Sequence, residues 1–91
     1  MTIDELFKII LERKKKMPKN SYVASLFRAG QDRIIQKVGE EATESMIAAK
    51  NKDRKQVISE IADLWFHLLV FLAYVNITPE EIMEELEKRK K

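Results

Sequence analysis

Four acidic side chains in the middle of this 91-residue sequence have the chemistry and the spacing to bind a metal ion. They form two pairs, Glu41 with Glu44 and Glu60 with Asp63, whose members are three positions apart. A step of three residues keeps two side chains on one face of an α-helix. The second pair stands at the edge of the most apolar segment, where an unpaired carboxylate is costly. These acids therefore either face water or bind something.

The spacing between the two pairs fits a helical hairpin that turns near residue 52. In two antiparallel helices, residues equally distant from the turn lie at similar heights. Glu44 and Glu60 are each eight residues from position 52. Glu41 and Asp63 are each eleven residues from it. At about 1.5 Å per residue, Glu44 should therefore lie within about one helical turn of the height of Glu60, and Glu41 within the same range of Asp63. Two stripes of carboxylates are thus predicted to face one another.

Lys37 and His67 extend the two stripes, since each lies fifteen residues from position 52. Lys37 precedes Glu41 by four positions and is interpreted either as a phosphate contact or as the ion-pair partner of Glu41. A histidine on a mostly apolar helix is usually a hydrogen-bonded core residue. The place of His67 on the acidic stripe also allows it to orient a carboxylate.

Four carboxylates in one small space repel one another unless their charge is neutralised. Neutralising them by protonation requires that the pKa of at least two carboxyls be raised by several units. A divalent cation removes the repulsion directly. Oxygen ligands select hard ions, so we expect Mg²⁺, with Mn²⁺ as a substitute, and Mg²⁺ commonly shares its ligands with a substrate phosphate. The alternative is a solvated acidic groove flanked by Lys37, Lys50 and Arg33.

The elements that position these acids are predicted to be helices, because the chain has only two Gly and two Pro and clear capping signals. Four helices are expected: from the Thr2 cap to the lysines before Pro18, from about Asp32 to Lys50, from the Asp53 cap to about Asn76, and from the Thr78 cap through Leu86. Residues 17–31 are expected to form a connector in which Ser21 caps one or two short turns and Gly30 ends them.

Apolar residues predict how these helices pack. In the second expected helix, Ile35, Val38, Ala42, Met46 and Ala49 are predicted to supply one apolar face. Gly39 costs that helix about 1 kcal/mol relative to Ala, which we attribute to a close helix contact or to room for a ligand. The third expected helix contains LWFHLLVFLAYV and is apolar on nearly every side. Three short neighbours cannot cover it, so we expect a homo-oligomer, at least a dimer, built on this helix.

Composition predicts one soluble cytoplasmic domain of the all-α class, spanning residues 1–91. The sequence is 45% hydrophobic and 35% charged, which is too apolar for disorder. The formal charge of +2 gives no reason to expect a nucleic-acid partner. The chain has no cysteine, which excludes disulfides and thiolate zinc sites. Acids at positions 4 and 5 do not fit a signal peptide, and Ile61–Val75 is shorter than the ~20 residues that cross a bilayer.

The acids also match a known pattern. Glu40-Glu41-x-x-Glu44, followed after fifteen residues by Glu60-x-x-Asp63, resembles the EExxE…ExxD signature of the all-α nucleotide pyrophosphohydrolases, which have a MazG-like fold. Over essentially the whole chain, SYVASLFRAGQDRIIQKVGEEATESMIAAKN and ADLWFHLLVFLAYVNITPEEIMEELEKR resemble the phosphoribosyl-ATP pyrophosphohydrolases of histidine biosynthesis. The resemblance implies Mg²⁺-dependent hydrolysis of phosphoribosyl-ATP to phosphoribosyl-AMP and pyrophosphate. It also implies a four-helix MazG-like domain that is completed by homodimerisation.

The resemblance implies roles for individual residues. The four paired acids would hold one or two Mg²⁺ ions against the triphosphate, and one of them would take a proton from the attacking water. Glu40 differs in direction from Glu41 by about 100°, so it is expected to support a ligand or to lie on the helix surface. Arg28 and Arg33 are weaker phosphate candidates, for which a solvated face is the alternative. Tyr22 either closes over the substrate or simply packs.

Three other functions are compatible with parts of this pattern. A standard or damaged nucleoside triphosphate could be the substrate, since only SYVASLF and GQDRIIQKVGEEATE favour the histidine pathway. A redox di-metal bundle would use Glu-x-x-His pairs, whereas the only histidine here lies four residues after Asp63. A non-catalytic helical module would dimerise through its third helix and would not need the acids.

Overall fold

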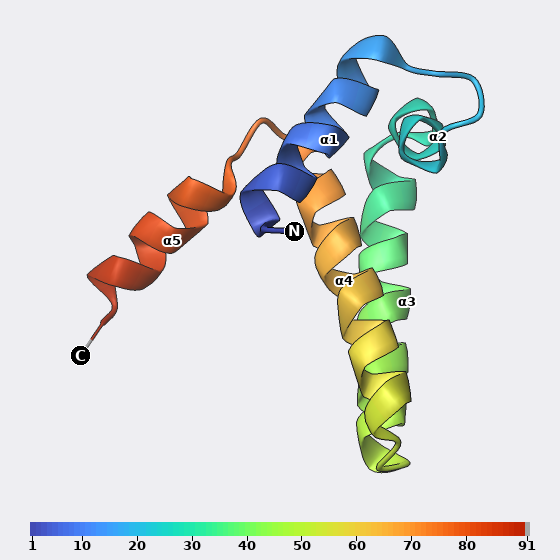
Figure 1. Ribbon diagram of the computed structural model, residues 1–91, viewed down its shortest axis with the longest axis vertical. Helices are drawn as coiled ribbons and strands as arrows, with labels where there is room; N and C mark the ends of the chain where they lie inside the picture. The colour runs from blue at the N-terminus through green and yellow to red at the C-terminus, as the bar shows by residue number, and fades with distance from the viewer. Residues whose placement is uncertain (91) are drawn as a thin grey trace.

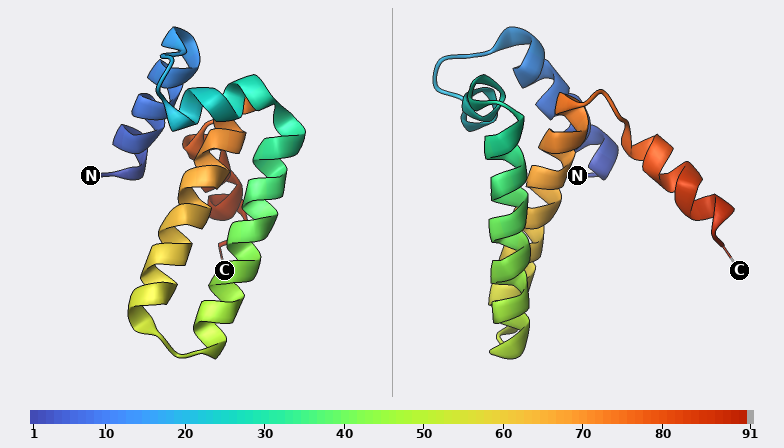
Figure 2. Two further views of the ribbon diagram at one scale, coloured as in Figure 1. Left: turned by 90° about the vertical axis from the view of Figure 1, so that its right-hand side faces the viewer. Right: turned by 180° about the vertical axis from the view of Figure 1, so that it is seen from behind.

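The structure, a computed structural model, describes residues 1–90, and five helices carry most of them (Figure 1). These are α1 (Ile3–Lys16), α2 (Tyr22–Ala29), α3 (Gln31–Lys50), α4 (Arg54–Tyr74) and α5 (Pro79–Lys88). Helices α3 and α4 form a long antiparallel hairpin, α1 and α2 lie at its open end, and α5 projects away (Figure 2). No strand occurs among residues 1–90, so the predicted all-α class is confirmed.

Short-range capping sets the start of four of the five helices. The side chains of Thr2, Ser21 and Asp53 each accept a hydrogen bond at 3.1 Å from the backbone N–H three positions later. Thr78 and Glu81 form a complete capping box at the start of α5. Because each cap pairs an N–H group that has no partner within its helix, these helices begin beside the predicted capping residues.

The segment between α1 and α3 contains more helix than the sequence predicts. Instead of one or two short turns, Tyr22–Ala29 form an eight-residue helix. Ala24 and Leu26 are buried, so contacts with neighbouring helices stabilise a helix that is too short to be stable alone. Gly30 separates α2 from α3 with φ of 97°, a conformation that residues with a Cβ rarely adopt. The prediction of four helices was therefore wrong by one.

The closed end of the hairpin lies where the sequence predicts it. Asn51 ends α3, Asp53 caps α4, and Lys52 between them has a left-handed backbone with φ of 56°. The two helices then pack side by side along their length (Figure 2). The prediction of a tight turn around residue 52 is confirmed, which places the acids of the two helices opposite one another.

The inward face of α3 is not the predicted apolar face. Ile35 and Met46, which the sequence assigns to that face, are 44% and 63% exposed. The buried residues of α3 are Ile34, Glu41, Ser45 and Ala48. The register set by the turn directs the acidic stripe toward α4, so the stripe of Ile35 and Met46 faces outward. A Cβ at Gly39 would meet nothing within 4 Å, so among the described residues the predicted close helix contact is absent and open space remains.

The apolar core gathers at the open end of the hairpin. It consists of Phe7, Ile10, Leu26, Ile34, Leu69, Val70 and Ala73. Helices α1 and α2 supply its outer layer, and Lys14 links α1 to the end of α4 by donating to the Ala73 carbonyl oxygen at 2.7 Å. Among the described residues, the end of the hairpin nearer the turn has no comparable cover, so Glu44 and Asp63 are exposed there, whereas Glu41 is buried.

Helix α4 is 21 residues long, so by length and composition alone it is long and apolar enough to cross a membrane. The helix is longer than the apolar segment Ile61–Val75 considered from the sequence, because it begins with additional, more polar turns at Arg54. Glu60, Asp63 and His67 interrupt it, and it packs against α3 and α1 as the central helix of the fold. A central helix of a helical domain has this composition without a membrane.

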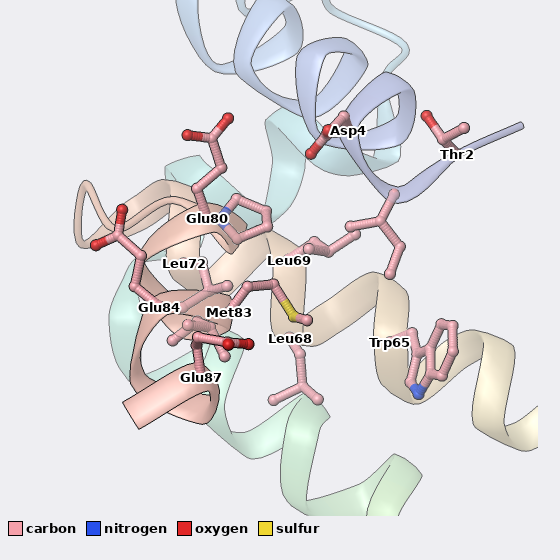
Figure 3. A pocket seen from close by; sticks show the side chains of 13 residues that line it. Thr2, Asp4, Trp65, Leu68, Leu69, Leu72, Glu80, Met83, Glu84 and Glu87 are labelled. Carbon is pink, nitrogen blue, oxygen red and sulfur yellow. The ribbon is translucent and has the colours of Figure 1, made fainter. Parts of the chain in front are cut away.

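A large apolar groove separates α5 from the rest of the molecule. It has a volume of about 710 Å³ and lies between the start of α1, the middle of α4 and α5 (Figure 3). Trp65 and Met83 line it and are 55% and 62% exposed. Helix α5 buries none of its residues, although one of its faces is apolar.

Candidate functional site

Three carboxylates from the two arms of the hairpin converge to form one group. Each of Glu41 on α3 and Glu60 and Asp63 on α4 offers an oxygen within 4.8 Å of the other two. We call these three residues the acidic cluster. Glu41 is buried, Glu60 is half-buried and Asp63 is exposed, so the cluster opens to solvent on one side. The turn at residue 52 and the three- and four-residue spacings of the helices together produce this convergence.

Two oxygens of the acidic cluster have no partner. Oε2 of Glu41 and Oε2 of Glu60 are buried without a hydrogen bond among the described residues. A buried acceptor that lacks a donor costs free energy, and two such carboxylates near each other add repulsion. A divalent cation between them would satisfy both oxygens. The residues present therefore fit a hard metal ion such as Mg²⁺.

Glu44, the fourth predicted acid, lies beside Glu60 and outside the group of three. Its carboxyl raises the pKa of Glu60 above its ordinary value, because the two groups can share a hydrogen bond only when one of them is protonated. Desolvation and the charges of Glu44 and Glu41 raise that pKa further. Glu44 is exposed and lines a hollow of about 450 Å³ near the turn, together with Glu60. The proximity of these acids means that the site attracts protons or cations.

Lys37 forms an ion pair with Oε1, the other carboxylate oxygen of Glu41. Its Nζ lies 3.3 Å from Glu41 Oε1 and 3.4 Å from Glu40 Oε2. Burial acts to lower the pKa of Lys37, but the hydrogen bonds to Glu41 and Glu40 and the nearby Tyr22 phenol together raise it. Arg33 approaches Glu40 at 3.8 Å. Glu40 is thus paired with cations at the margin of the site, and Oε1 is the oxygen of Glu41 that pairs with Lys37.

Two residues of α4 fix the geometry around the other members of the cluster. Gln56 donates from Nε2 to Glu60 Oε1 at 3.3 Å, which leaves Glu60 Oε2 free. We did not predict this contact from the sequence, although the four-residue spacing of Gln56 and Glu60 was a usable signal. His67 Nδ1 lies 2.7 Å from the backbone oxygen of Asp63, and its Nε2 lies 2.9 Å from the Tyr22 hydroxyl.

Arg28 and Arg33 differ in what they contact. Arg28 donates from Nη2 to the carbonyl oxygens of Met17 and Pro18, at 3.1 Å each. It therefore closes the loop between α1 and α2. Arg33 reaches the site only through Glu40. Tyr22, in contrast, comes from α2 and hydrogen-bonds to His67, which in turn contacts the backbone oxygen of Asp63.

The groove beside α5 is larger than the hollow at the acids but offers different chemistry. Its lining is mostly apolar, and its acids, such as Glu84 and Glu87, lie around it without converging (Figure 3). Hydrolysis needs charge stabilisation and a proton acceptor at one point. The carboxylates of the acidic cluster can accept a proton and can hold a cation that would supply the charge stabilisation, so we place the candidate active site there and treat the groove as a packing surface.

The comparisons with known proteins agree in what they match. A sequence model of the family described as phosphoribosyl-ATP pyrophosphohydrolase matches residues 3–90. The chain is 49% identical over 88 residues to the phosphoribosyl-ATP pyrophosphatase of Methylibium petroleiphilum, covering 97% of this chain and 73% of the relative. The protein of that name from Pelotomaculum thermopropionicum is 47% identical over 88 residues, with 97% and 90% covered. The one from Saccharolobus solfataricus is 46% identical over 89 residues, with 98% and 95% covered.

Proposed function

Because the chain belongs to the phosphoribosyl-ATP pyrophosphohydrolase family, we propose that it hydrolyses phosphoribosyl-ATP to phosphoribosyl-AMP and pyrophosphate with the help of Mg²⁺. This reaction would serve histidine biosynthesis in the cytoplasm, and residues 1–91 would act as one catalytic domain. The observation that carries the chemistry is the pair of buried oxygens without partners, Glu41 Oε2 and Glu60 Oε2, in a cluster with Asp63.

The residues in and around the acidic cluster would have different roles in catalysis, according to their surroundings. Glu41, Glu60 and Asp63 would hold Mg²⁺, which would polarise a phosphoryl oxygen and compensate the charge of the leaving pyrophosphate. Lys37 pairs with Oε1 of Glu41 and Gln56 donates to Oε1 of Glu60, so Oε2 of each glutamate would be available to the ion. Asp63 is the exposed member, and its carboxylate can take the proton of the attacking water. Glu44 lies on the open side and can share in holding a second ion.

We propose that the active protein is a homodimer formed through the outer face of α4 and the groove beside α5. Trp65, Leu68 and Met83 supply an exposed apolar surface there. Monomeric soluble proteins rarely leave such a surface open. A 91-residue chain is also near the size at which one core provides only marginal stability, so burial against a second copy would add stability.

Substrate choice and metal dependence are tested together. The metal-free protein is offered phosphoribosyl-ATP, dCTP or dUTP, with and without Mg²⁺, and release of pyrophosphate is measured. We expect Mg²⁺-dependent release that is fastest from phosphoribosyl-ATP. Faster turnover of either deoxynucleotide would contradict the proposed substrate. Equal rates with and without added metal would contradict the role of the acidic cluster.

A further inference from the structure

His67 is held in one orientation by two hydrogen bonds. The residue is only 4% exposed, although it lies on a helix that borders the acidic cluster. Its Nδ1 faces the backbone oxygen of Asp63 at 2.7 Å. A carbonyl oxygen only accepts hydrogen bonds, so Nδ1 carries the proton. In the neutral ring, Nε2 is then an acceptor.

This arrangement determines what the Tyr22 hydroxyl can do. The hydroxyl lies 2.9 Å from His67 Nε2, so beside a neutral ring protonated at Nδ1 the Tyr22 O–H donates to Nε2. A hydroxyl has one proton and two lone pairs. With its proton committed to His67, the Tyr22 oxygen can only accept further hydrogen bonds.

Tyr22 is exposed and is linked to the acidic cluster through His67. Its ring stacks on Phe66 with centroids 6.2 Å apart, yet the residue remains 50% exposed. His67 ties it to the Asp63 backbone, and Lys37, which pairs with Glu41, lies near enough for the phenol to influence its charge. The exposed Tyr22 oxygen is therefore linked through the His67 ring to the backbone of Asp63, a member of the acidic cluster.

The phosphates of a nucleotide are ionised acceptors, so they cannot donate to this oxygen. The donors of a nucleotide are its sugar hydroxyls and the N–H groups of its base, and the sugar lies nearer the phosphates. We propose that His67 fixes the Tyr22 hydroxyl as an acceptor that binds a ribose hydroxyl of the substrate. Tyr22 thereby selects a substrate that carries this hydroxyl, and His67 acts as a positioning residue. This inference rests on the proposed function, because it requires a nucleotide at the acidic cluster.

The hydrogen-bond arrangement is testable without activity, because His67 is the only histidine in the chain. Protein labelled with ¹⁵N-histidine gives ring signals from this residue alone. We expect a protonated Nδ1 and an unprotonated Nε2 at neutral pH, with a shift of the Nε2 signal in Tyr22→Phe. A ring protonated at Nε2 would overturn the inference. If the protein failed to hydrolyse phosphoribosyl-ATP, the proposed function would fall, while this measurement would still decide the role of His67.

The ligand contact is tested with phosphoribosyl-ATP and two analogues that lack the 2′- or the 3′-hydroxyl of the ribose that carries the triphosphate. We expect one analogue to lose about fivefold to tenfold in kcat/KM on the wild type, mainly through KM, which is typical of one neutral hydrogen bond. Tyr22→Phe should show the same loss with the parent substrate and no further loss with that analogue. Tyr74→Phe, which removes the hydroxyl of the other tyrosine, is the control and should behave as the wild type. If Tyr22→Phe still lost as much kcat/KM as the wild type when that hydroxyl was removed from the substrate, the contact would be overturned.

Two replacements of His67 separate positioning from packing. His67→Gln can keep an acceptor near Nε2 for Tyr22, and His67→Asn can keep a donor near Nδ1 for the Asp63 backbone. We expect the first to retain selection for the hydroxyl and the second to lose it as Tyr22→Phe does, with both folds checked by circular dichroism. Equal hydroxyl selection in the two variants would show that His67 does not act through Tyr22.

Discussion

Glu41 shows at the scale of one residue how the fold and the candidate site depend on each other. It is 95% buried by its place between α3 and α4, a position that a carboxylate rarely occupies without partners. Lys37 satisfies one oxygen, and the other remains free beside Glu60. A protein selected only for stability would replace such a group by an apolar one. Keeping it is consistent with a group that binds a cation.

Replacement of Asp63 by Asn tests the cluster directly. We expect kcat/KM to fall by at least about 100-fold, because a charged ligand and proton acceptor is lost. The melting temperature without metal should stay the same or rise slightly, since repulsion within the cluster falls. The rise in melting temperature caused by Mg²⁺ should disappear. Activity assays and thermal melts measure this, with Glu12→Gln, an exposed acid on α1, as the control.

The raised pKa of Glu60 predicts how metal binding depends on pH. Its neighbour Glu44 favours the protonated form, so the folded protein holds this proton above the ordinary pKa of 4.5. A pKa raised by folding stabilises the metal-free protein at low pH, and this stabilisation is lost as pH rises through the folded-state pKa. Mg²⁺ competes with the proton. The increase in melting temperature caused by Mg²⁺ should therefore be small near pH 4.5 and larger at pH 7 to 8, and an increase independent of pH would contradict this account.

At the scale of elements, the sequence predicted what short-range signals determine. Caps at Thr2, Asp53 and Thr78 are read from neighbours three residues away, and the count from the turn brought Glu41 near Asp63. The length of α2 and the inward face of α3 depend on packing between distant segments, so the sequence alone misjudged both. The bond between Tyr22 and His67 joins residues 45 positions apart. The sequence proposed each of the two residues separately as a site candidate, but it gave no sign of their contact.

Lys14 provides a prediction at this scale, because it joins the end of α1 to the end of α4. Its Nζ donates to the Ala73 carbonyl oxygen at 2.7 Å and to Asn76 Oδ1 at 3.0 Å. Lys14→Met should lower the free energy of unfolding by about 1–2 kcal/mol, since these hydrogen bonds to a charged donor are lost. Urea unfolding at a fixed protein concentration measures the change. Lys15→Met, which changes an exposed neighbour, is the matched control. Equal effects of the two changes on the free energy of unfolding would show that Lys14 does not stabilise the contact between α1 and α4.

At the scale of the whole molecule, the uneven distribution of apolar surface is the main feature. The core fills the open end of the hairpin, whereas the outer faces of α3, α4 and α5 expose large apolar side chains. Helix α5 projects from the body instead of packing along it (Figure 1). An amphipathic helix without cover gains little from burial in the monomer. A second copy that inserts into the groove would cover α5 and the exposed side of α4 together.

Trp65→Glu tests this assembly, because Trp65 lines the groove and is 55% exposed, so the change should not disrupt the core of one chain. We expect sedimentation to give twice the chain mass of 10.7 kDa for the wild type and the mass of one chain for the variant. The melting temperature of the wild type should rise with protein concentration, whereas that of the variant should not. Ile9→Glu, which alters an exposed apolar residue of α1 outside the groove, should remain dimeric. A wild type that sediments as a single chain at every concentration would contradict the dimer. If Trp65→Glu remained dimeric, the interface would lie elsewhere. The exposed apolar residues Ile35 and Met46 on α3 would then be the next surface to test.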